Sequence, residues 1–128
     1  MALSLFDELQ PLCQIVSLDD GDGTTPVYVT QGPGRGARID QLSFSSSSVA
    51  AAQVTVYLNQ GANVPIGTVA VPAGAGMSSA VPAVDAIPIL APVLAGLVLA
   101  PGTSLYVGVA VALLAGELLN VVALGGSF

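Results

Sequence analysis

The stretch that decides the fold is residues 97–126, LVLAPGTSLYVGVAVALLAGELLNVVALGG. Its middle part alternates between apolar side chains and small or polar ones, and the apolar set would share one face: Leu105, Val107, Val109 and Val111. Apolar residues at period two predict a β-strand with one buried face. Pro101-Gly102 before it and Ala115-Gly116-Glu117 after it predict turns, so residues 118–124 would return as the final strand.

The same signals predict further short strands upstream, at residues 14–18, 27–30, 38–45, 53–59, 65–71 and near 80–87. The strand at 38–45 changes phase midway, which predicts a bulge near Asp40-Gln41, and the serine tract 45–48 is expected in a loop. No amphipathic helix separates these strands. About eight short strands joined by turns therefore predict an all-β fold, an antiparallel β-sandwich or jelly roll spanning residues 13–128.

Residues 1–12 differ from the rest and are expected to form an N-terminal arm. Ser4 and Asp7 fit the start of a short helix, and Pro11 would end it. The apolar side chains of this segment are Leu3, Leu5, Phe6 and Leu9. Two interpretations stay open: a frayed terminus, or an arm that docks onto a neighbouring subunit.

The composition predicts a surface that other subunits cover. Only 8% of the 128 residues are charged, against roughly 25% in typical soluble domains, while 53% are apolar. Large exposed apolar patches usually mark interaction sites. The alternative is a weakly charged monomer with a Ser, Thr and Gly surface. A net charge of −6 with two basic residues argues against nucleic-acid binding, which needs Lys and Arg to neutralise phosphates.

Neither a membrane span nor a secretion signal is expected. Residues 86–116 lack charge, but prolines and glycines interrupt them, and the longest unbroken piece is residues 105–115. A spanning helix needs about 20 apolar residues. The segment MALSLFDELQP has acids where a signal peptide would carry basic residues.

Few residues could carry chemistry. Residues 19–23, DDGDG, resemble the start of a calcium loop, but the twelfth position from Asp20 is Gln31 rather than a bidentate acid, so a solvated turn is favoured. Residues 32–36 are glycine-rich without the Lys-Ser/Thr ending of a phosphate loop. Cys13, the single cysteine, is expected to be a buried strand residue rather than a reactive thiol.

Catalysis and cofactors are not expected. The chain has no histidine, which removes the common Ser-His-Asp and Cys-His devices and makes a transition-metal site improbable. Asp85 and Glu117 are isolated carboxylates in apolar sequence, and no aromatic platform for sugars is evident beyond three separate residues, Tyr28, Tyr57 and Tyr106. Arg38 and Asp40 would lie on one face of a strand, as a surface ion pair or as a contact with a neighbouring subunit.

Four segments, in order, resemble a group of small phage and prophage proteins. Residues 36–42, GARIDQL, are similar to that group's G-x-K/R-I-D-x-I opening, and residues 54–61, VTVYLNQG, to the strand that follows. Residues 97–105, LVLAPGTSL, resemble its P-x-x-L-P-x-G-x-x-L segment. Residues 120–127, NVVALGGS, resemble its N-V-x-A-x-G-G-D ending, with Ser127 in place of Asp. The first 35 residues are not covered.

The resemblance implies a β-sandwich virion component of a tailed phage. Such proteins commonly decorate the capsid as trimers between hexamers and pentamers of the major capsid protein. The expected function is therefore a capsid decoration or cement protein on the virion exterior, made in the host cytoplasm. Its partners would be its own copies, as a homotrimer, and the major capsid protein. Expected contacts are the arm, with Leu3, Leu5, Phe6 and Leu9, and the pair Arg38 and Asp40. The alternatives are a tail- or fibre-associated adhesin and, less favoured, a cellular β-protein.

Overall fold

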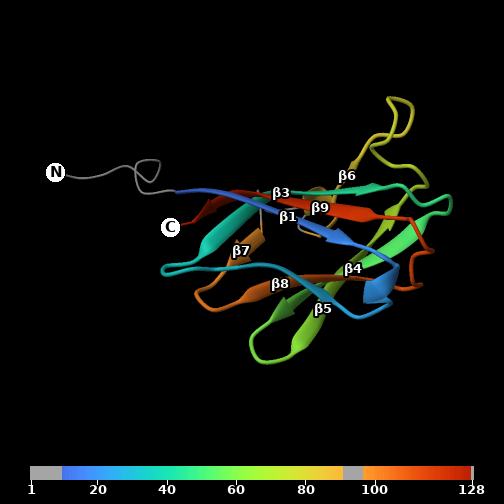
Figure 1. Cartoon of the computed structure of the whole chain (residues 1–128). Helices are drawn as coiled ribbons and strands as arrows, with labels where there is room; N and C mark the ends of the chain where they lie inside the picture. Colours follow the sequence, from blue (N-terminus) through green and yellow to red (C-terminus); the bar gives the residue numbers. More distant parts are fainter. Residues whose placement is uncertain (1–9, 91–96, 128) are drawn as a thin grey trace.

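The computed structural model describes residues 10–90 and 97–127, and it confirms the predicted all-β fold. Two antiparallel sheets pack face to face as a sandwich (Figure 1). The first sheet has the order β1-β9-β3-β6, and β7 also pairs with β3. Its strands are β1 (Gln10–Leu18), β9 (Leu119–Ser127), β3 (Ala37–Ser46), β6 (Val84–Asp85) and β7 (Leu97–Leu99).

The second sheet has the order β2-β8-β4-β5. Its strands are β2 (Val27–Gln31), β8 (Ser104–Val109), β4 (Ala52–Asn59) and β5 (Asn63–Val71). Two short helices complete the described residues, a 3-10 turn η1 (Asp20–Asp22) and α2 (Ile87–Leu90). The region expected to hold a strand near 80–87 therefore contains only the two-residue β6 and then α2. None of the described helices is long and apolar enough to cross a membrane.

The core lies between the sheets and follows the period of two. From the first sheet it takes Ile39, Leu42, Phe44, Leu119 and Val121, and from the second Val54, Val56, Val69, Leu105 and Val107, all at most 1% exposed. The predicted buried face of β8 is confirmed for Leu105, Val107 and Val109. Val111 was expected on the same face but is 80% exposed, because β8 ends at Val109 and the chain bends out of the sheet.

The predicted bulge in β3 is confirmed. The pairing of β3 with β9 shifts between Ile39 and Gln41, so Asp40 has no partner in the ladder. Next to the bulge the two strands approach closely at Gly125, where an added Cβ would collide with the backbone carbonyl of Arg38. Only glycine fits at that position, so Gly125 allows the central β3–β9 pairing.

Strand β1 begins at Gln10, so residues 10–12 of the expected arm belong to the first sheet. Pro11, expected to end a helix, lies opposite Gly126 on β1. An edge strand accepts proline because its outer N–H positions need no partner. Cys13 is exposed, and its expected burial was wrong, because alternation places it on the outer face with Ile15. The serine tract was also misplaced in part, since Ser45 and Ser46 end β3.

Candidate interaction site at one end of the sandwich

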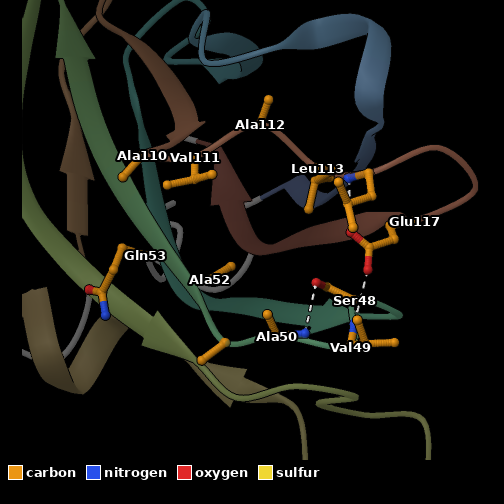
Figure 2. Close-up of a pocket in the computed structure, with 12 residues that line it drawn as sticks. Ser48, Val49, Ala50, Ala52, Gln53, Ala110, Val111, Ala112, Leu113 and Glu117 are labelled. Atoms are coloured by element: carbon orange, nitrogen blue, oxygen red, sulfur yellow. Dashed lines mark hydrogen bonds between the residues drawn. The ribbon is translucent and has the colours of Figure 1, made fainter.

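Two connections leave the same end of the sandwich and are joined by one carboxylate. They are the β3–β4 connection, residues 47–51, and the β8–β9 connection, residues 110–118 (Figure 1). The side chain of Glu117 accepts a hydrogen bond from the backbone N–H of Val49 at 3.0 Å and another from that of Leu114 at 2.9 Å. Figure 2 shows Glu117 between the two connections. This side chain thus links the two connections.

Serines strengthen this link. The backbone N–H of Leu118 donates to the Ser47 hydroxyl at 2.9 Å, and the N–H of Ser47 donates to the Leu118 carbonyl at 3.0 Å. The Ser48 hydroxyl accepts from the N–H of Ala50 at 3.2 Å, a bond that Figure 2 also draws. Ser48 is buried. The serine tract therefore satisfies backbone groups where β3 leaves the sheet, which is a common use of serine in turns.

The environment of Glu117 favours its charged form. The hydrogen bond from Leu114 and then that from Val49 lower the pKa of the carboxyl below its ordinary value of 4.5. Burial opposes this, and a bond with the Ser48 side chain lowers the pKa further. Hydrogen bonds donated to a carboxylate stabilise it relative to the acid. Glu117 is therefore an ionised structural acceptor at neutral pH.

The connections held by Glu117 present an apolar surface, which we call the loop-end patch: Val49, Val111 and Leu114 with the alanines around them. Their exposed fractions are 84%, 80% and 65%, the first two being the largest among the exposed large hydrophobic residues of the described chain. A hollow of about 280 Å³ lies between the connections, and its lining includes five alanines beside the valines and leucines (Figure 2). Apolar side chains exposed around a hollow are typical of an interaction site.

The contact residues expected from the sequence lie elsewhere. Arg38 and Asp40 form an ion pair of 2.7 Å, with both side chains partly exposed on the outer face of the first sheet. Arg38 is near the start of β3, whereas the loop-end patch follows its end, ~26 Å away at the rise of an extended strand. Leu3, Leu5, Phe6 and Leu9 lie outside the described residues.

The acids that the sequence singled out act on the backbone. In the 19–23 turn, Asp19 accepts from the N–H of Gly21 at 2.9 Å, and Asp22 accepts from the N–H of Asp19 at 2.9 Å, which caps η1. Asp85 accepts from the N–H groups of Leu42 and Ile87. Within residues 10–90 and 97–127, no three acidic, histidine or cysteine side chains gather as a metal site would require.

The loop-end patch was not predicted from the sequence. Val111 was assigned to the core by alternation, and Glu117 was taken as an isolated acid in a turn. One signal was present: a single acid within a long uncharged segment has to be solvated or supplied with donors. One donor, the N–H of Leu114, is three residues away, but the other, the N–H of Val49, is 68 positions earlier in the chain.

The chain matches no protein-family model, no curated protein and no solved structure.

Proposed function

We propose that this chain is a structural virion protein of a tailed phage, a decoration or cement protein that bridges capsomers on the capsid exterior. The observation that carries the proposal is the loop-end patch. It exposes Val49, Val111 and Leu114 on connections that Glu117 already holds in place. A surface ordered before binding loses less conformational entropy when a partner covers it. Such a patch suits permanent attachment to another protein.

The rest of the surface supports a subunit with several neighbours. Large hydrophobic side chains are exposed on both sheets and on the connections, including Ile15, Val64, Met77, Ile89 and Val98. Each square ångström of apolar surface removed from water contributes about 25 cal/mol. A subunit in a closed shell can cover several such areas at once. The net charge of −6 suits the exterior, because packaged DNA would repel it.

The strand order supports the jelly-roll form of the sandwich. The chain crosses repeatedly between the sheets and produces the orders β1-β9-β3-β6 and β2-β8-β4-β5. Jelly rolls with two four-stranded sheets recur in viral capsid domains, among other proteins. Fold alone does not establish function. It agrees with the virion function that the resemblance of residues 36–127 implies.

A second contact is proposed where β1 begins. In the first sheet, Arg38 is opposite Gly126, and Gly126 is opposite Pro11. The ion pair of Arg38 and Asp40 therefore lies two strands from the point where residues 1–9 precede β1. We assign Leu3, Leu5, Phe6 and Leu9, together with this ion pair, to that contact. The two contacts, at opposite ends of β3, would let one subunit bridge two capsomers.

Cosedimentation with shells assembled without this chain tests the function. The wild-type protein should pellet with the shells. A Val49→Asp, Leu114→Asp double variant should pellet much less, because two charges would be desolvated in the contact and only the second contact would remain. Ala62→Asp, which places a charge at an exposed small residue of the β4–β5 turn, is the control and should pellet. A wild-type protein that never pellets, or a double variant that pellets equally, contradicts the proposal.

A further inference from the structure

All three tyrosines of the chain lie in one row across the second sheet. Tyr28 is directly opposite Tyr106, Tyr106 is opposite Tyr57, and Tyr57 is opposite Pro65. Residues directly paired on antiparallel strands point to the same side of the sheet. The neighbours in sequence, such as Val56 and Val107, point into the core. The tyrosine row therefore crosses β2, β8 and β4 on the outer face of the sandwich, and Pro65 continues it on β5.

The three rings occupy neighbouring positions and are partly exposed. The centroids of Tyr28 and Tyr106 are 5.7 Å apart with an interplanar angle of 79°, an edge-to-face contact. Tyr28 is 45% exposed, and Tyr57 and Tyr106 are half-buried. Two rings that support each other are held in a fixed orientation, and such pairs contribute stability beyond their burial. The row combines apolar ring surface with phenolic hydroxyl groups.

Hydrogen-bonding side chains line both sides of the row. On one side, a second row of directly paired residues crosses the same four strands, with Gln31 opposite Ser104, Ser104 opposite Asn59, and Asn59 opposite Asn63. The amide of Asn59 donates to that of Asn63 at 2.8 Å. On the other side, the hydroxyls of Thr55 and Thr68 are 3.1 Å apart. Amides and hydroxyls both donate and accept hydrogen bonds, so they match ligand hydroxyl groups.

Strands β2, β8, β4 and β5 contain no charged residue. A nucleic acid also stacks on aromatic rings, but it needs Lys or Arg for its phosphates. An uncharged ligand with apolar ring faces and many hydroxyl groups fits both the rings and their flanks. We propose that the tyrosine row binds a neutral polysaccharide, with sugar rings stacked on the tyrosines and hydroxyls bound by the flanking amides. This activity is separate from attachment to the shell, which uses the loop-end patch.

Intrinsic fluorescence reports on this row alone, because the chain has three Tyr and no Trp. The probes are four neutral polymers, dextran, mannan, galactan and hydroxyethylcellulose, with alginate as a charged comparison. At least one neutral polymer should slow the protein in a native affinity gel and change its tyrosine emission. Alginate should do neither, because the protein and the polymer are both negative. If no neutral polymer acts, or if alginate acts equally, the proposal is wrong.

Variants locate the binding. Tyr28→Ala removes the most exposed ring and should weaken binding about three- to tenfold, the range expected for one aromatic contact. Asn59→Ala, which leaves the rings in place, should also weaken binding. Ile15→Ala, on the outer face of the other sheet, is the control and should bind normally. Full binding by both row variants, with wild-type melting temperatures, would overturn the proposal. So would light scattering showing that the row is buried between two copies, with Tyr28→Ala separating them.

Discussion

A carboxylate flanked by apolar residues holds the end of this sandwich together. Glu117 accepts two backbone hydrogen bonds, from Val49 and Leu114, on connections that are far apart in the chain. Those bonds lower the pKa of Glu117, so the charged form is the one that the fold uses. The ionised side chain of Glu117 thus supports the loop-end patch, together with the bonds between Ser47 and Leu118.

Glu117→Gln should lower the melting temperature. The amide keeps one acceptor oxygen and replaces the other with donors, so one of the two N–H groups loses its partner. Asp20→Asn removes the same charge from an exposed position of η1 and is the matched control. Thermal unfolding followed by circular dichroism measures both. Equal melting temperatures for Glu117→Gln and Asp20→Asn would show that the carboxylate does not stabilise the connections.

The lowered pKa of Glu117 also predicts that the effect of Glu117→Gln on the melting temperature depends on pH. Because the pKa of Glu117 is lowered in the folded protein, the carboxylate stabilises the fold at pH values above the group's ordinary pKa of 4.5. That stabilisation should be lost as the pH falls through the folded pKa. The difference in melting temperature between the wild type and Glu117→Gln should therefore shrink on acidification. A difference that stays constant from neutral to acidic pH would contradict the assignment.

At the scale of elements, the central pairing of β3 with β9 depends on a glycine. Gly125→Ala should destabilise the fold strongly, because the new Cβ would meet the carbonyl of Arg38 in rigid backbone. Gly102→Ala is the control: Gly102 has a φ of 79° but open space around it, so only a conformational cost of about 1–2 kcal/mol is expected. Denaturant unfolding compares the two. A loss for Gly125→Ala no larger than for Gly102→Ala would show that the strands can move apart.

Strands could be predicted from the sequence where apolar and polar residues alternate without interruption. Residues 27–30 and 53–59 alternate cleanly, and β2 and β4 cover them. The bulge in β3 was visible because a phase change is itself a local signal. The ends of strands were less predictable. β8 stops at Val109 although the alternation continues, and β1 extends back to Gln10 because β9 reaches Ser127 and supplies a partner.

At the scale of the whole molecule, ten large hydrophobic residues of the described ranges are exposed. Covering the exposed apolar side chains lowers their free energy, so we expect the chain to assemble. Light scattering of the purified protein at neutral pH should give the mass of a trimer, the assembly that the resemblance to decoration proteins implies. A mass of 12.6 kDa at every concentration would identify a monomer. That result would contradict the inference that the composition requires burial among copies of the chain.

The sequence by itself determined the all-β class, the positions of most strands and the apolar, weakly charged character of the surface. Alternation, turn residues and composition are properties of neighbouring residues or of sums over the chain. The tertiary structure alone decided which separated residues meet. Glu117 reaches Val49, and Tyr28, Tyr57 and Tyr106 form one row, because strand order and register bring them together. Register is set by pairing between distant strands, which no local pattern contains.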